Sequence, residues 1–132
     1  MTGAAPAPIP KPTAAELEIL TVLWQIGPAT VRQVHEVLEA RKGAGYTTVL
    51  KLMQIMADKG LVRREESGRA HIYTPRLRKE DTQGQLIEDL MDKVFGGSAA
   101  QLVIRALENR KATREELDEI RRMIDEHERN AQ

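Results

Sequence analysis

The spacing of hydrophobic residues predicts a helix near the start of the chain. Thr13 and Glu16 have the spacing of an N-terminal capping box, in which each side chain satisfies a backbone donor of the other residue. Residues 17–26 then carry a wide apolar stripe, and Gly27-Pro28 ends it. We expect the core-facing positions to be Leu17, Ile19, Leu20, Leu23, Trp24 and Ile26.

The same periodicity predicts two further helices before residue 60. Thr30 and Gln33 form a second capping box, and that helix ends near Arg41. A third helix begins at Thr47 or Thr48, with Gly60 as its C-cap. The positions expected to face the core are Val31, Val34, Val37 and Leu38 in the second helix, and Val49, Leu52, Met53 and Met56 in the third.

After residue 60 the period changes from helical to alternating. Residues 61–65 and 70–74 read as two short strands, joined by a Ser-Gly turn within residues 66–69 and ended by Pro75. Three helices followed by a hairpin are the winged form of the helix-turn-helix. We therefore predict a mainly α fold with a small β-hairpin.

The remainder of the chain predicts three more helices. The first runs from Asp81 to a break at Gly96-Gly97, a third capping box at residues 98–101 opens the second, and Thr113 with Glu116 opens the last. The three helices are short and their apolar stripes are narrow, so packing against one another does not bury all of their apolar residues. A partner chain that covers these stripes is therefore expected.

Composition and charge divide the chain in the same places. Residues 1–12 are rich in Ala and Pro and read as a flexible tail, residues 13–79 as the winged-helix domain, and residues 80–132 as a helical dimerisation region. The net charge is zero, but residues 1–79 hold 12 basic and 7 acidic side chains and the rest hold 8 and 13. The +5 of the first part suggests a polyanionic partner.

Several function classes are excluded by what the sequence lacks. With no Cys there is no disulfide framework or thiolate metal site, which fits the cytoplasm. No apolar run is long enough for a membrane span, and the N-terminus does not resemble a secretory signal. No phosphate-binding loop, nucleophile elbow or paired-carboxylate site is recognisable, so we expect neither an enzyme nor a cofactor.

The third helix is the expected reader of DNA. Once its core positions are assigned, its outer face consists of Thr47, Thr48, Leu50, Lys51, Gln54 and Asp58. Thr, Lys and Gln can donate to base edges in the major groove, and Leu50 is placed to touch a thymine methyl group. The alternative is an ordinary solvated face. The hairpin adds Arg63, Arg64, Arg69 and His71, which suit a DNA backbone or minor groove, or else merely keep an edge hairpin soluble.

Two other features invite alternatives. His35 begins a run similar to the zinc-protease helix motif, but Glu39 stands where the second His is required, so no metal site is expected there. The carboxylates of residues 108–128 suggest a metal- or ligand-responsive sensor as one alternative function. A protein-interaction adaptor built on a winged helix without sequence-specific DNA binding is the other.

The sequence resembles the penicillinase-repressor (BlaI/MecI) family over about residues 14–128. The resemblance rests on the segments LEIL at 17–20, TVRQV at 30–34, GYTTVL at 45–50, KGLVRR at 59–64, GRAHIYTP at 68–75 and GGS at 96–98. It implies a homodimeric bacterial repressor that binds a palindromic DNA operator, with a sensor protease as a further candidate partner.

The resemblance also assigns roles to individual residues. Those implied to bind DNA, in the major groove or at phosphates, are Arg32, Tyr46, Thr47, Thr48, Lys51, Gln54, Arg69 and His71. Those implied to form the dimer seam are Leu86, Leu90, Val94, Leu102, Val103, Leu107, Leu117, Ile120 and Ile124.

The chain departs from the family pattern in two respects. Repressors of β-lactam resistance in the family are cleaved at an Asn-Phe bond, and residues 97–101 contain neither residue. The copper-responsive branch carries C-terminal cysteines, which are absent here. Copper sensing of that kind is therefore excluded.

Overall fold

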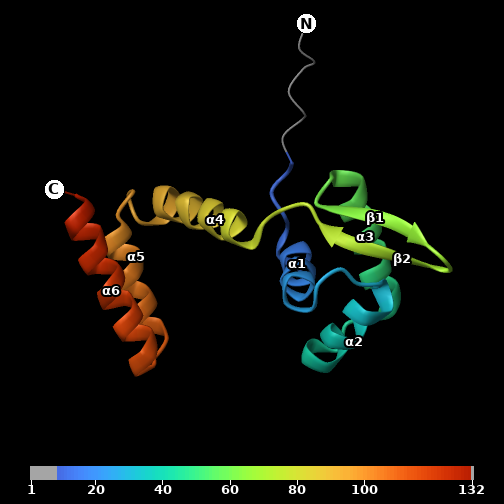
Figure 1. The fold of residues 1–132 in the computed structure, drawn as a ribbon, viewed down its shortest axis with the longest axis horizontal. Coiled ribbons are helices and arrows are strands. Elements are labelled where there is room, and N and C mark those ends of the chain that lie inside the picture. The colour runs from blue at the N-terminus through green and yellow to red at the C-terminus, as the bar shows by residue number, and fades with distance from the viewer. Residues whose placement is uncertain (1–8, 132) are drawn as a thin grey trace, which may run out of the picture. The chain divides into compact units, whose positions relative to one another are not determined.

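The computed structural model describes residues 9–131 and confirms a mainly α fold with one β-hairpin (Figure 1). Residues 1–8 of the tail predicted over residues 1–12 lie outside the described residues. In chain order the elements are α1 (Ala14–Ile26), α2 (Val31–Lys42), α3 (Tyr46–Lys59), β1 (Val62–Ser67), β2 (Ala70–Pro75), α4 (Lys79–Val94), α5 (Ala99–Asn109) and α6 (Arg114–Asn130). The chain divides into two compact units between Gln83 and Gly84, within α4.

The hydrophobic core of the first unit is built from α1, α2, α3 and the hairpin. Its buried apolar residues are Ile19, Leu20, Val22, Leu23, Ala29, Val31, Val34, Leu38, Val49, Met53, Met56, Leu61, Val62 and Tyr73. The prediction for Ile26 is wrong, because this side chain is 46% exposed at the end of α1. Leu17, Trp24, Val37 and Leu52 are half-buried rather than buried.

Capping residues set the beginnings of three helices as the sequence predicts, whereas α5 and α3 differ from the prediction. Complete capping boxes start α1 at Thr13, α2 at Thr30 and α6 at Thr113. At α5 the Ser98 hydroxyl accepts a hydrogen bond from the Gln101 backbone, but the reciprocal bond is missing, so the third box is incomplete. α3 begins at Tyr46, earlier than predicted, after Gly45, which provides no side-chain cap.

The two strands form one antiparallel sheet that is tied to the helices. Val62 pairs with Pro75 and Ser67 with Ala70, leaving Gly68 and Arg69 as a two-residue turn. Gly68 has a φ of 67°, whereas no described non-glycine residue has a positive φ, which fits a type II′ turn. Tyr73 exchanges two backbone hydrogen bonds with Ala29, of 2.8 and 3.1 Å. This bridge holds the base of the wing against the start of α2.

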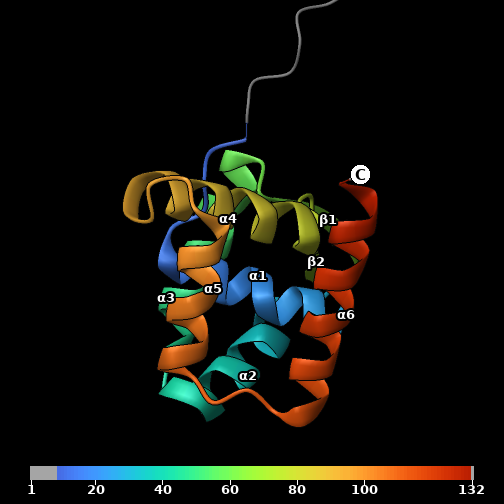
Figure 2. The same cartoon turned by 90° about the vertical axis from the view of Figure 1, so that its left-hand side faces the viewer.

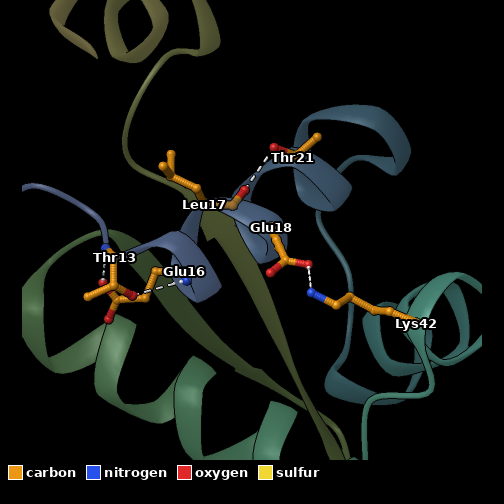
Figure 3. A network of polar contacts seen from close by, with 6 residues as sticks. All are labelled: Thr13, Glu16, Leu17, Glu18, Thr21 and Lys42. Atoms are coloured by element: carbon orange, nitrogen blue, oxygen red, sulfur yellow. Dashed lines mark hydrogen bonds and ion pairs between the residues drawn. The ribbon is translucent and has the colours of Figure 1, made fainter. Parts of the chain in front are cut away.

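Two ion pairs fasten α1 to its neighbours. The Lys42 Nζ at the end of α2 lies 2.6 Å from the Glu18 carboxylate, and both side chains are largely solvent-accessible (Figure 3). Glu16 is different, because its carboxylate is 2% exposed. It accepts hydrogen bonds from the Thr13 backbone at 2.9 Å and from Lys59 Nζ at 2.8 Å. The capping box of α1 therefore also holds the C-terminal end of α3.

Replacing Glu16 by Gln tests the contribution of this buried carboxylate. Burial by itself raises the pKa of Glu16, but hydrogen bonds from Lys59 and Thr13 and the charge of Lys59 outweigh it and leave the pKa lowered. A carboxylate whose pKa is lower in the folded than in the unfolded state stabilises the fold when the pH is above its unfolded pKa of about 4.3. This stabilisation is lost as the pH falls through the pKa of the folded state. We expect Glu16→Gln to reduce the free energy of unfolding by about 2 kcal/mol at pH 7 and by less at pH 3.

Urea unfolding, followed by the fluorescence of Trp24, the only tryptophan, measures this difference. The matched control is Lys42→Met, which breaks the exposed pair with Glu18 and should cost less than about 1 kcal/mol. Equal losses in the two variants, or a Glu16→Gln effect that does not shrink in acid, would contradict this assignment.

The second unit exposes much of its apolar surface. α5 and α6 run antiparallel and are joined by a short loop, as the orange and red helices of Figure 2 show. No described residue of α5 or α6 is buried. A mostly apolar groove of about 780 Å³ lies between the two helices, lined by side chains that include Val103, Ile104, Ile120, Met123 and Ile124.

Candidate nucleic-acid interface

A tight turn places α3 relative to α2. Gly43 caps α2 with a φ of 67°, a left-handed conformation that favours glycine, and its amide donates to the Glu39 carbonyl at 2.9 Å. Gly45 then begins α3 in an extended conformation. Val49, Met53 and Met56 anchor α3 in the core, so its opposite face is left to solvent.

The exposed face of α3 gathers most of the predicted DNA-binding residues. Thr47, Thr48, Lys51 and Gln54 are all exposed. Thr47, Thr48 and Lys51 also line one shallow cavity of about 500 Å³ together with Ala15 of α1. Among the described residues, neither Lys51 nor Gln54 has a side-chain hydrogen bond or an ion pair. Their donors are therefore available to an external acceptor.

One predicted member of this face is placed differently. Leu50 is half-buried and packs against the hydrophobic core, so the expectation that it lies on the outer face with Lys51 is wrong. The sequence pattern assigned Leu50 to the outer face because Val49 and Met53 define the apolar stripe that faces the core. The apolar surface of the first unit is wide enough to cover Leu50 as well.

The remaining predicted residues lie beside α3 or on the wing. Arg32 is exposed on α2, and Tyr46 is 46% exposed as the first residue of α3. Arg69 is exposed in the turn of the wing and, within residues 9–131, has no ion-pair partner. His71 is half-buried, and its Nε2 lies 3.9 Å from the Glu66 carboxylate on β1. That carboxylate disfavours a phosphate near His71.

The two other arginines singled out on the wing are also exposed. Arg63 lies 3.2 Å from the Glu65 carboxylate, whereas Arg64 has no ion pair within the described part of the chain. Arg64 and Arg69 are thus the wing arginines without an ion pair in the described part of the chain. They suit the positioning contacts that proteins make to the DNA backbone.

Sequence reasoning missed one contact in this region. His35 of α2 packs edge-on against Tyr46, with ring centroids 5.5 Å apart and an interplanar angle of 83°. The His35 Nε2 also lies 3.4 Å from the Glu39 carboxylate. Helical spacing pairs His35 with Glu39, but no local pattern links His35 to Tyr46, which belongs to the next helix.

The histidines and carboxylates of the described part of the chain are the side chains that could hold a metal ion. No three His, Asp or Glu side chains there lie close enough together to hold a metal ion. Three of the carboxylates in residues 108–128 form ion pairs with arginines of their own helix, namely Glu108 with Arg105, Asp118 with Arg121 and Glu119 with Arg122. None of the described helices is both long and apolar enough to cross a membrane.

These features define the class of the first unit. A helix-turn-helix formed by α2 and α3, supported by α1 and followed by a two-stranded wing, is a winged-helix domain. The chain belongs to the penicillinase repressor family, whose sequence profile matches residues 12–126. Both the predicted fold and the family resemblance are confirmed.

Individual relatives agree with this placement. The chain is 36% identical over 113 residues to the transcriptional regulator BlaI of Mycobacterium tuberculosis, covering 84% of this chain and 80% of that protein. It is 24% identical over 119 residues to the penicillinase repressor of Bacillus licheniformis, with 90% and 93% covered. The solved DNA-binding domain of the repressor BlaI matches 56% of this chain and 90% of its own, at 26% identity and a TM-score of 0.51.

Proposed function

We propose that this protein is a cytoplasmic transcriptional repressor without catalytic activity that binds a palindromic DNA operator as a homodimer. The observation that carries the proposal is the exposed face of α3, where Thr47, Thr48, Lys51 and Gln54 lie together in a winged helix of the penicillinase repressor family. In a helix-turn-helix the second helix enters the major groove, and such side chains contact base edges there. Arg32 and Tyr46, which line one cavity, and the exposed Arg69 in the turn of the wing suit backbone phosphates.

The second unit supports the homodimer. Six residues of the predicted seam are between 36% and 63% exposed, namely Leu86, Leu90, Val94, Val103, Leu107 and Ile124, and the other three, Leu102, Leu117 and Ile120, are half-buried. Ile87, Ile104 and Met123 extend the exposed apolar surface. Soluble chains rarely leave contiguous apolar patches of this kind uncovered. A second copy, which carries the same surface, covers it by symmetry.

Selection of bound fragments from a genomic DNA pool tests the proposal. We expect one enriched motif with two inverted half-sites, separated by about one helical turn or a multiple of it, because each α3 of a symmetric dimer reads one half. Enrichment of no motif would contradict DNA recognition by this chain. A motif with a single, asymmetric half-site would contradict the dimeric arrangement.

Arg69→Ala tests the role of the wing. Because Arg69 suits a phosphate rather than a base, we expect the variant to bind every DNA sequence more weakly by a similar factor, about fivefold. The dependence of log affinity on log salt concentration should also become shallower by about 0.9. Mobility shifts with the selected operator and a scrambled duplex, over a salt series, measure both effects. Arg69→Lys keeps the charge and is the matched control, and a loss confined to the operator would argue instead for a base contact.

A further inference from the structure

His35 stands out because the proposed DNA contacts leave it without a role. Only 17% of its side chain is exposed, although it belongs to α2, whose outer residues Arg32 and Glu36 are exposed. It contacts both the Tyr46 ring and the Glu39 carboxylate. A ring that bridges two helices in this way constrains where its neighbour points.

The surroundings of Tyr46 explain why its position needs a constraint. Tyr46 shares an open cavity of about 510 Å³ with Arg32, His35, Glu36 and Glu39. A phosphate that approaches this cavity meets one cation, one phenol hydroxyl and two carboxylates. Only a hydroxyl held on the Arg32 side, away from the carboxylates, adds to the attraction of that cation.

The geometry around His35 suits such a constraint. Its edge-on contact with Tyr46 is a favoured arrangement for two aromatic rings, because the positive edge of one faces the negative face of the other. Tyr46 follows Gly45, whose carbonyl accepts a hydrogen bond from the Val49 amide at 3.2 Å but which gives the first turn of α3 no side-chain cap. The contact with α2 supplies a restraint to this end of the recognition helix.

We propose that His35 is a positioning residue for DNA binding, which holds the Tyr46 ring so that its hydroxyl, together with Arg32, receives one backbone phosphate of the operator. The inference rests on the proposed DNA-binding function. It assigns to His35 no contact with DNA of its own. The Glu39 carboxylate, 3.4 Å from the His35 Nε2, gives the imidazole ring a second contact.

A double-mutant cycle on the full-length protein tests this role. We expect His35→Ala to weaken operator binding by roughly two- to tenfold, the range that aromatic pair energies span. Tyr46→Ala should weaken it at least as much. In the Tyr46→Ala background, His35→Ala should cause no further loss, because its effect passes through the missing ring. Two losses that multiply would overturn the proposal.

Ring rescue separates positioning from general packing. His35→Phe keeps the edge-on contact with Tyr46 and should retain operator affinity close to that of the original protein. His35→Leu fills a similar volume without a ring and should resemble His35→Ala. Thermal unfolding confirms that each variant is folded, and the Phe and Leu pair carries the test if His35→Ala does not fold. Equal operator affinities of the His35→Phe and His35→Leu variants would contradict a ring-specific role.

The outcome for His35 is distinguishable from the outcome for DNA binding itself. If the original protein shows no preference for any selected fragment, the proposed function fails before the variants are compared. If it does show a preference while the cycle is multiplicative, repression by DNA binding stands and only the role of His35 is refuted.

Discussion

Replacing Thr48, Lys51 and Gln54 together by Ala is expected to remove the preference for the operator by a factor of at least about a hundred. Each base contact contributes roughly 1–3 kcal/mol of discrimination, and all three side chains are exposed on α3. The variant should remain folded, because none of the three is buried. Weak binding to all DNA should persist through Arg32, Arg64 and Arg69, which are left intact.

Competition between operator and scrambled duplexes measures this loss of preference, and Trp24 fluorescence checks the fold. The matched control replaces Gln85 and Lys111 by Ala. These are exposed residues of the same types as Gln54 and Lys51, but they lie outside the first unit. Undiminished preference in the folded triple variant would refute the assignment of α3 as the recognition helix.

Introducing Asp at both Leu107 and Ile124 is expected to separate the dimer. The two side chains are 41% and 52% exposed in the single chain, so the substitutions leave the fold of the monomer intact. In a dimer they would bury unpaired charges, which costs several kcal/mol. Affinity for the full operator should then fall by about 10²-fold or more, because two half-sites no longer gain from a linked second binding event. Affinity for an isolated half-site should not change.

Sedimentation equilibrium gives the oligomeric state of this variant. Arg114→Asp is the matched control, since it introduces an acid at the exposed N-terminus of α6 outside the apolar groove. A dimer that survives the Leu107 and Ile124 substitutions would show that these two positions lie outside the seam, and would contradict the proposed pairing through α5 and α6.

How far the sequence predicted the fold depended on how local each signal was. Thr13, Thr30 and Thr113 act on donors three residues away, so their capping boxes were recognisable and are present. The incomplete box at Ser98 shows the limit, because the same spacing leaves the second hydrogen bond to the local geometry. Ile26 had the right periodicity, but it is the last residue of α1, where the core covers it only partly.

The candidate site followed the same rule. The polar face of α3 was predictable, because Val49, Met53 and Met56 fix the helix orientation and leave Lys51 and Gln54 outside. The contact between His35 and Tyr46 was not predictable, because the turn between two helices decides it. The buried link from Glu16 to Lys59 is likewise a contact between residues far apart in sequence.

The opposite charges of the two parts of the chain fit the proposed division of tasks. The +5 of residues 1–79 lies in the unit that carries α3 and the wing, where it attracts DNA. The −5 of the remaining residues would keep the helices that we propose to form the dimer from binding DNA. The neutral total charge is thus the sum of a basic first part, which we propose reads DNA, and an acidic second part, which we propose forms the dimer.

The most direct test of sequence-specific repression is the ratio of affinities for the selected operator and a scrambled duplex of the same composition, measured at physiological salt. The proposed function predicts that the protein binds the operator at least about 10³-fold more tightly, the lower end of the range for specific DNA-binding proteins. Equal affinities for the two duplexes would contradict it.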